Sequence, residues 1–347
     1  MATFHNVTIK EIQQETADAV SVVFEIPENL KSDFHFTAGQ YITLQKELNG
    51  EEVRRAYSIC STPKSGEIRV AIKAVENGTF SVYATSKLKV GDAIEIAAPE
   101  GRFLLEPEPQ KNYIGFAAGS GITPILAMVK TVLENEPSST FTLVYGNKSV
   151  ADTIFYDQLL SLHAQYKNFN LEFVCSRERQ ENMLFGRIDG SYTNFFIKNK
   201  YKDITFDAAF LCGPETMIDI VSNTLKETGF LEKNIHFELF TTAEDEEALS
   251  TIKEGTTAIT VLLDDEETTF TMSQTDTILA ATLRNDLDAP YSCQGGVCSS
   301  CMGKVTEGKA VMTKNSILTD SEIAEGLILT CQAHPVTPKI MLDFDDV

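Results

Sequence analysis

The sequence predicts a multi-domain chain: an antiparallel β-barrel, then an α/β domain with a parallel sheet, then a small α+β domain of the β-grasp type. Three observations predict this order. Short segments of alternating apolar and polar residues fill the first hundred positions, strands and helices alternate after Pro107, and four cysteines gather near the end of the chain. With 347 residues, the chain is long enough for two or three domains, each with its own core.

The chain carries a large negative charge. Its 29 basic and 50 acidic residues give a formal net charge of −21, which opposes binding to nucleic acid or to an anionic membrane surface. There is no secretory signal and no apolar run of membrane-spanning length, and the scattered Cys60, Cys175 and Cys212 suit a reducing compartment. We therefore expect a cytoplasmic protein that binds neither nucleic acid nor membrane.

The first hundred residues predict the barrel. The segments VTIKEI, VSVVFEI, YITLQ, IRVAIKAV and AIEIAAP alternate in polarity, and turn signals such as Asn49-Gly50 and Ser65-Gly66 separate most of them. Among them, Arg55-Ala56-Tyr57-Ser58 brings a cation, an aromatic ring and a hydroxyl onto one strand. Such a strand can contact a phosphate, cover a flat ring system and hydrogen-bond its edge. The same tetrapeptide also describes an ordinary barrel strand.

A second motif of the barrel is Gly78-Thr79-Phe80-Ser81, which precedes the helical segment VYATSKL. A glycine and a hydroxyl at a helix start form an anion site from unpaired N–H groups and the helix dipole. Each motif alone is more often structural. Together in one barrel they favour a dinucleotide flavin.

The middle of the chain predicts a nucleotide-binding domain. The strand YIGFAA runs into the turn Gly119-Ser120-Gly121-Ile122-Thr123-Pro124 and the apolar helix ILAMVKTVL, with Thr123 expected as the N-cap and Pro124 as the first helical residue. A strand, a Gly-rich turn and a helix in this order are typical of a phosphate cradle, here without the third glycine of the full fingerprint.

Two more turns follow strand ends in this domain. Ser176, Arg177 and Arg179 come after LEFVC, where ligands of open α/β sheets bind, so a hydroxyl and an arginine there suit a 2′-phosphate. A solvated loop is an equally good interpretation from composition alone. The strand DAAFL leads into Cys212-Gly213-Pro214, and its place beside a tight turn favours a site for Cys212 over simple packing.

The last part of the chain is organised around cysteines. Cys293, Cys298 and Cys301 have the spacing C-x4-C-x2-C and Cys331 follows 30 residues later, which is the pattern of a plant-type 2Fe-2S cluster. Two glycines inside the loop let backbone N–H groups turn toward sulfide. A zinc knuckle fits less well, because the second half of the motif offers only Cys331, with His334 as a poor substitute, and a Rieske centre fits less well because no C-x-H occurs in the chain. Disulfide bonds are a further alternative, but three crowded thiols in one Gly-rich loop would pair badly.

Strands and a helix surround this motif. The segments AITVLL, TTFTM, CMGKV, LILTC and KIMLDF predict a small sheet that holds the helix TILAATLRN, opened by Asp276. Before them, TTAEDEEALSTIKEG is acidic and lacks periodicity, as a linker does. We therefore expect a barrel domain at 1–106, an α/β domain at 107–240, a linker at 241–255 and a cluster domain at 256–347.

With these motifs in order, the whole chain resembles a ferredoxin-NADP reductase-like flavoprotein fused to a C-terminal plant-type ferredoxin. Within that family, the segments TFHNVTI, GEEVRRAYSIC and LCGPETMI resemble the reductase subunits of phenylacetyl-CoA epoxidase complexes. The resemblance implies FAD, a 2Fe-2S cluster and NADPH as cosubstrate, with electrons passing in that line to an oxygenase component in phenylacetate catabolism. Reductases of Rieske oxygenases and ketosteroid hydroxylases share the architecture, there also with FMN. A flavoprotein with a non-catalytic zinc or docking domain is the alternative of a different class.

The resemblance also implies roles for single residues. Arg55 pairs with the flavin phosphate, Tyr57 stacks on the isoalloxazine and Ser58 hydrogen-bonds near N5. Ser58, Cys212 and Glu238 are the catalytic residues it implies, and Ser176 and Arg177 contact the 2′-phosphate. The remaining implied cofactor contacts are Ala56, Ile72, Lys73, Gly78, Thr79, Phe80, Ser81 and Phe240 for the flavin, and Gly119, Ser120, Gly121, Ile122, Thr123, Pro124, Cys212, Gly213, Pro214 and Met217 for the nicotinamide nucleotide. Cys293, Cys298, Cys301 and Cys331 are the implied iron ligands.

Overall fold

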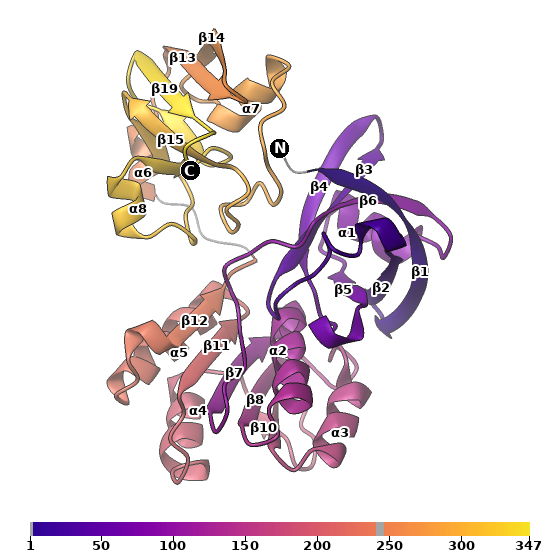
Figure 1. Ribbon diagram of the computed structural model, residues 1–347. Coiled ribbons are helices and arrows are strands. Elements are labelled where there is room, and N and C mark those ends of the chain that lie inside the picture. The colour runs from indigo at the N-terminus through magenta and orange to yellow at the C-terminus, as the bar shows by residue number, and fades with distance from the viewer. Residues whose placement is uncertain (1–2, 241–245) are drawn as a thin grey trace. The chain divides into compact units, whose positions relative to one another are not determined.

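The computed structural model describes residues 3–240 and 246–347 (Figure 1). The described chain divides into two compact units, Phe4–Glu238 and Leu239–Val347. The predicted fold class is confirmed: an antiparallel barrel and a parallel-sheet domain form the first unit, and an α+β domain forms the second. Within these ranges no helix has the length and apolar character needed to cross a membrane.

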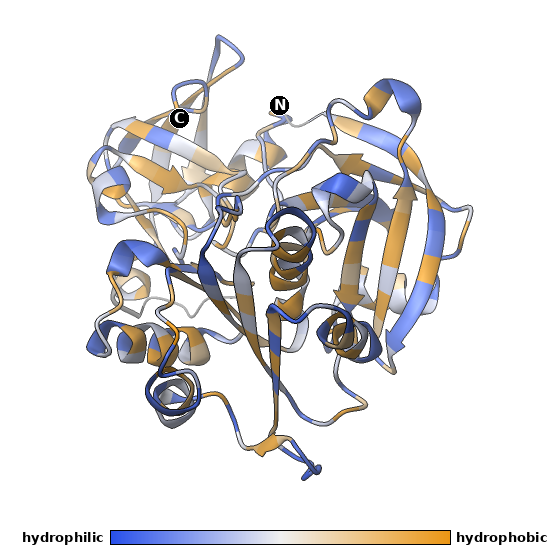
Figure 2. Cartoon of the chain, turned by 60° about the horizontal axis from the view of Figure 1, so that its bottom comes forward, coloured by the Kyte–Doolittle hydropathy of each residue, from blue (hydrophilic) through white to orange (hydrophobic). Residues whose placement is uncertain are grey.

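A six-stranded antiparallel barrel opens the first unit. Its strand order is β4-β3-β6-β1-β2-β5, and Ile59, directly after β4, pairs with Val70 of β5 and so joins the two edge strands. Apolar and polar residues alternate along these strands (Figure 2), because one face lines the core and the other meets solvent. The elements are β1 (Phe4–Thr16), β2 (Ala19–Glu25), η1 (Glu28–Leu30), β3 (Tyr41–Leu48), β4 (Glu51–Ser58), η2 (Pro63–Ser65), β5 (Ile68–Lys73), α1 (Thr79–Ser86) and β6 (Ala93–Ala97).

The parallel sheet of the first unit has the order β10-β9-β8-β7-β11-β12. The chain enters in the middle at β7, moves outward to β10, and returns to the other side of β7 with β11 and β12. This change of direction brings the carboxyl ends of β7 and β11 together, which is where open α/β sheets bind ligands. The strands are β7 (Asn112–Ala118), β8 (Thr140–Asn147), β9 (Phe169–Cys175), β10 (Leu184–Phe185), β11 (Ala208–Cys212) and β12 (Ile235–Glu238).

Helix α2 packs against both the sheet and the barrel. Its apolar residues share one continuous core with Ala38, Cys60 and Phe103 of the barrel part, so barrel and sheet form a single unit. The helical segments here are η3 (Gly119–Gly121), α2 (Ile122–Asn135), α3 (Tyr156–Gln165), α4 (Gly190–Asn194), η4 (Phe195–Lys200, a π-helix), α5 (Glu215–Glu227) and η5 (Glu232–Asn234).

The start of α2 differs from its prediction. The 3₁₀ turn η3 continues directly into the helix, and the N–H of Ile122 donates to the carbonyl groups of Gly119 and Ser120. Thr123 therefore lies inside the helix, where its Oγ1 donates to Ser120 O at 3.1 Å. The prediction that Thr123 is the N-cap and Pro124 the first helical residue is wrong, because the glycine turn itself already supplies the first helical bonds.

The second unit is the α+β domain. A five-stranded sheet with the order β14-β13-β19-β15-β17 and a two-stranded sheet of β16 and β18 pack on α7, whose Ile278 and Leu279 lie in the shared core. The elements are α6 (Glu246–Thr251), β13 (Thr256–Leu263), β14 (Glu266–Ser273), α7 (Ile278–Arg284), β15 (Met302–Glu307), β16 (Ala310–Met312), α8 (Asp320–Ala324), β17 (Leu327–Leu329), β18 (Ala333–Pro335) and β19 (Lys339–Asp343).

Two local expectations in this unit need correction. Thr277, not Asp276, caps α7: its hydroxyl accepts from Ala280 N at 3.2 Å, while Asp276 pairs with Arg284. Of the predicted linker, 241–245 lie outside the described residues, and the remainder contains the short helix α6. Glu, Ala and Leu have high intrinsic helix propensity, which outweighs the lack of an apolar stripe.

Candidate functional site

Strand β4 carries the aromatic part of the candidate site. Arg55 and Tyr57 pair with Leu44 and Ile42 of β3, so their side chains share the face of these two core residues. The ring of Tyr57 lies 5.8 Å from that of Phe80 at the start of α1. Burial raises the pKa of Tyr57 above its ordinary range, which keeps the phenol neutral and leaves a flat, uncharged ring.

Ser58 at the end of β4 contacts the edge of the parallel sheet. Its Oγ donates to Glu238 Oε2 at 3.0 Å, and Glu238, the last residue of β12, pairs in register with Cys212, the last residue of β11. Burial, aided by the Glu238 carboxylate, raises the pKa of the Cys212 thiol. The three predicted catalytic residues therefore lie together, with the thiol protonated and the carboxylate hydrogen-bonded.

The amino end of α1 offers backbone N–H groups. A Cβ atom on Gly78 would lie 2.3 Å from Ser81 Oγ and 2.5 Å from a methyl group of Val75, so the site requires glycine. Ser81 Oγ accepts from Val75 N at 3.2 Å. No side chain of the described residues caps this helix, and its first N–H groups remain open to an anion.

Two glycine turns meet where the sheet changes direction. A Cβ atom on Gly121 would lie 2.1 Å from Cys212 O, and one on Gly213 would lie 3.1 Å from Ala118 Cβ. The turns that follow β7 and β11 are therefore in direct contact, which is possible only because both lack side chains here. The approach leaves main chain, rather than side chain, to face a nucleotide.

Ser176 and Arg177 follow β9 at the same edge of the sheet. The N–H of Ser176 donates to Asn147 O and that of Arg177 to Lys148 O, both at 2.9 Å. These bonds set Lys148 beside Arg177, and both side chains are exposed. Lys148 is absent from the residues predicted from the sequence. Arg179 turns elsewhere, with its guanidinium 4.2 Å from the ring centroid of Phe185.

Other predicted contacts differ in how much surface they offer. Ile72 is fully buried in the barrel core, and Lys73 pairs with Asp18 at 3.5 Å. Met217 is buried in the first turn of α5, behind Pro214. Phe240, beyond β12, is exposed.

The four predicted iron ligands form two pairs. The thiol of Cys298 hydrogen-bonds Cys293 and lowers the pKa of Cys293 to about 7, and the thiol of Cys301 lowers the pKa of Cys331 in the same way. In the described chain no three His, Cys, Asp or Glu side chains are grouped around one metal position. Two pairs of thiols fit a cluster of two irons, with one pair for each iron.

The loop around these cysteines is held by its neighbours. Gly295 N donates to Cys293 Sγ at 3.3 Å, as expected of a loop whose N–H groups face sulfur. Gln332, next to the fourth cysteine, donates from Nε2 to Gln294 O at 2.8 Å. Gln332 is absent from the residues predicted from the sequence. Its position next to Cys331 is the feature of the sequence that could have identified it.

Three known domain families match the chain. The family described as "Oxidoreductase FAD-binding domain" matches residues 6–104, "Oxidoreductase NAD-binding domain" matches residues 116–223, and "2Fe-2S iron-sulfur cluster binding domain" matches residues 261–336. The order of these families is the order of motifs predicted from the sequence.

Similar proteins cover nearly the whole chain. A subunit of the 1,2-phenylacetyl-CoA epoxidase of Escherichia coli (strain K12) is 40% identical, and the match covers 99% of both chains. A "3-ketosteroid-9-alpha-monooxygenase, ferredoxin reductase component" of Rhodococcus rhodochrous is 29% identical, over 97% of this chain and 96% of its own. The solved structure of phthalate dioxygenase reductase shares the fold, with a TM-score of 0.65, 22% identity and 98% of each chain covered. The resemblance expected from the motifs is confirmed.

Proposed function

Because the chain belongs to the family of FAD- and 2Fe-2S-containing oxygenase reductases that includes the phenylacetyl-CoA epoxidase reductase, we propose that it oxidises NADPH and delivers single electrons to the oxygenase component of a phenylacetyl-CoA epoxidase. The chain is an oxidoreductase with FAD-, NAD- and 2Fe-2S-binding domains. The observation that carries the proposal is the meeting of Ser58, Glu238 and Cys212 at the edge of the parallel sheet.

The cofactors supply the electron chemistry: a bound flavin takes a hydride and releases its electrons singly, and a plant-type cluster near roughly −400 mV carries one electron at a time. The residues of this chain bind and orient. Arg55 and the open N–H groups of α1 would hold the flavin phosphates. Tyr57 would cover one face of the flat ring and exclude water from it.

The sheet edge orients the nicotinamide. The contacting turns after β7 and β11 present main chain to the nucleotide. Ser58 donates its hydroxyl proton to Glu238, so its oxygen would be left to accept a hydrogen bond from a flavin N–H group beside it. The thiol of Cys212 is fully buried and keeps its proton, so it adds no charge beside Glu238.

NADPH rather than NADH is the proposed cosubstrate. Arg177, Ser176 and Lys148 provide two cations and a hydroxyl at neighbouring strand ends, which suits a dianionic 2′-phosphate. The acidic part from Ser250 onward, with 15 Asp and Glu against 6 Lys and Arg, suits a basic docking surface on the oxygenase.

The family matches support a division into a barrel domain (1–106), a nucleotide domain (107–240), a linker (241–255) and a cluster domain (256–347). Cys60, Cys175 and Cys212 are free thiols in buried positions, which supports a reducing, cytoplasmic location.

The test is reconstitution. The FAD- and cluster-loaded protein is mixed with NADPH and the phenylacetyl-CoA epoxidase oxygenase component, and epoxide formation is measured. We expect turnover that depends on both proteins. The related ketosteroid reductase gives the alternative oxygenase: turnover with a ketosteroid 9α-monooxygenase, and none with the epoxidase, would replace the proposal.

A further inference from the structure

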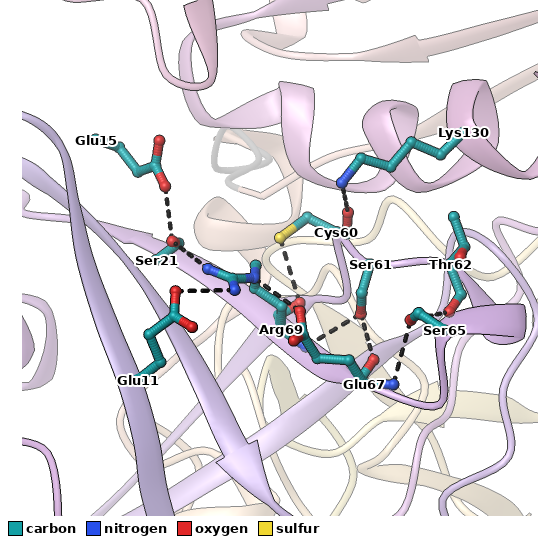
Figure 3. A network of polar contacts seen from close by, with 10 residues as sticks. All are labelled: Glu11, Glu15, Ser21, Cys60, Ser61, Thr62, Ser65, Glu67, Arg69 and Lys130. Atoms are coloured by element: carbon teal, nitrogen blue, oxygen red, sulfur yellow. Dashed lines mark hydrogen bonds and ion pairs between the residues drawn. The ribbon is translucent and has the colours of Figure 1, made fainter. Parts of the chain in front are cut away.

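A lysine inside the first unit connects α2 to the segment that follows β4 (Figure 3). Every residue of α2 from Ile122 to Leu133 is buried except Lys130, which is partly buried. Lys130 Nζ donates to the backbone carbonyl of Cys60 at 3.2 Å. Burial lowers the pKa of this ammonium group, because a charge is held in surroundings that solvate it poorly.

Cys60 is fixed on its other side as well. Its N–H donates to Arg69 O at 2.8 Å and its Sγ donates to the same oxygen at 3.3 Å. Burial raises the pKa of this thiol to about 12, so the sulfur keeps its proton and remains a donor. The segment that ends in Cys60, two residues beyond Ser58, is therefore held between β5 and α2.

The Arg69 side chain extends this support into the barrel (Figure 3). Its guanidinium contacts Glu67 at 2.9 Å, Glu11 at 3.0 Å and Ser21 Oγ at 3.1 Å. Ser21 in turn donates to Glu15 at 2.6 Å. These contacts link strands β1, β2 and β5 to Arg69, which binds Cys60 from the barrel side. Lys130 binds Cys60 from the helix side.

The two ends of this arrangement belong to the two cofactor-binding parts. Helix α2 begins at the glycine turn that faces the nucleotide, and Lys130 lies seven residues after Thr123, about 10 Å along a rigid helix. Ser58 lies on the strand assigned to the flavin. Hydride transfer requires the reacting atoms about 3–3.5 Å apart, and a misplacement of about 1 Å costs up to 10²-fold in rate.

Resting on the proposed function, we propose that Lys130 is a positioning residue for hydride transfer: its hydrogen bond to Cys60 O fixes the nucleotide turn relative to Ser58. A purely structural role of Lys130 predicts that its replacement lowers stability and rate together. Replacing a buried charge by an apolar side chain of similar length is often neutral or stabilising. A positioning role therefore predicts a slower hydride transfer without a loss of stability.

The test is Lys130→Met in the FAD-loaded full-length protein, with Lys226→Met as the matched control, because Lys226 lies on the exposed side of α5 and pairs only with Glu232 among its described ion-pair partners. Anaerobic stopped-flow measures flavin reduction at saturating NADPH. We expect the limiting rate constant of Lys130→Met to fall at least tenfold, while the dissociation constant for NADPH changes little and the melting temperature stays the same or rises. The control keeps the wild-type rate.

A kinetic isotope effect separates positioning from other causes. The rate constant of flavin reduction is measured with NADPH and with NADPH deuterated at the transferred position. If hydride transfer limits the rate in Lys130→Met, the ratio of the two rate constants is at least as large as in the wild type. Should Lys130→Met lose its flavin, Lys130→Gln, which keeps a neutral donor, is measured in the same way, and its limiting rate constant is expected to fall below the wild-type value by less than tenfold.

Two outcomes overturn the positioning role: a folded variant that reduces flavin at the wild-type rate, or a slow variant without an isotope effect. Absence of flavin reduction in the wild-type protein would contradict the proposed function itself and the positioning role with it. Wild-type reduction together with an equally fast Lys130→Met would contradict the positioning role alone.

Discussion

Ser58 Oγ and Glu238 Oε2 are joined by a hydrogen bond of 3.0 Å although 180 positions separate the two residues. The bond connects the last residue of a barrel strand to the last residue of the edge strand of the parallel sheet. It therefore brings the part of the chain assigned to the flavin to the edge where a nucleotide binds, next to Cys212.

Removing this bond tests the catalytic assignment. Ser58→Ala leaves Glu238 without its hydroxyl partner, and the loss of a hydrogen bond to a charged group costs about 1.5–3 kcal/mol. We expect flavin reduction by NADPH to slow roughly 10- to 100-fold, measured by stopped-flow absorbance. Ser86→Ala, at the exposed end of α1, serves as the control. An unchanged rate in Ser58→Ala would contradict the role of Ser58.

Cys331 is expected to be essential for the cluster. In Cys331→Ser the pair with Cys301 loses one thiolate, so we expect loss of iron and acid-labile sulfide while NADPH still reduces the flavin. Cys175→Ser, a buried thiol remote in sequence from the loop, is the control and keeps its cluster. Wild-type iron content together with an unchanged electron paramagnetic resonance signal in Cys331→Ser would remove this cysteine from the ligand set.

Nucleotide preference depends on the cations at the strand ends. Arg177→Ala removes a charge-assisted hydrogen bond of about 1.5–3 kcal/mol, so the Michaelis constant for NADPH rises at least about tenfold with little change for NADH. Lys148→Ala is expected to act in the same direction. Arg179→Ala is the matched control, because its guanidinium covers Phe185 instead. If the wild-type protein uses NADH and NADPH equally well, this assignment is excluded.

Lys130 gives a pH dependence with a defined sign. Burial lowers its pKa below the ordinary 10.5, so between the two values the unfolded chain binds more protons and the stability contributed by this residue rises with pH. Below that window the buried charge destabilises the fold. The groups that face it are Cys60, Arg69, Glu67, Glu134 and Glu15.

The measurement compares melting temperatures of wild type and Lys130→Met at pH 7 and at pH 10. Raising the pH is expected to change the difference between the two proteins in favour of wild type, because only wild type loses the buried charge. The same difference at both pH values would mean that Lys130 is not perturbed in the folded protein.

Electron delivery to the oxygenase is expected to depend on salt. If acidic residues of the second unit guide the encounter, raising the ionic strength above physiological values, where the Debye length is about 8 Å, slows oxygenase turnover. Flavin reduction by NADPH, measured alone, changes much less. Turnover that is independent of salt would exclude electrostatic guidance.

Much of the fold follows from local patterns in the sequence. Period-two strands predicted the barrel, strand and helix alternation predicted the parallel sheet, and the cysteine spacing predicted the cluster loop. These features depend on residues close together in the chain, so the sequence alone contains them.

Long-range contacts explain what was missed. Lys148 acquires its place because Arg177 N bonds its carbonyl, and Lys130 because α2 packs against the segment after β4. In the sequence neither lysine can be distinguished from a surface lysine, because strand register and helix packing determine what each contacts. The predicted N-cap of α2 is wrong for a related reason. A glycine turn that continues into a helix needs no side chain to cap that helix.

The most direct test of the proposed electron path follows both cofactors after anaerobic mixing with NADPH. Absorbance measures reduction of the flavin, and electron paramagnetic resonance of samples frozen at intervals measures reduction of the cluster. We predict that the flavin is reduced first, that the cluster signal grows as the flavin returns electrons, and that Cys331→Ser stops at the reduced flavin and fails to support the oxygenase. Normal oxygenase turnover in Cys331→Ser would contradict this path.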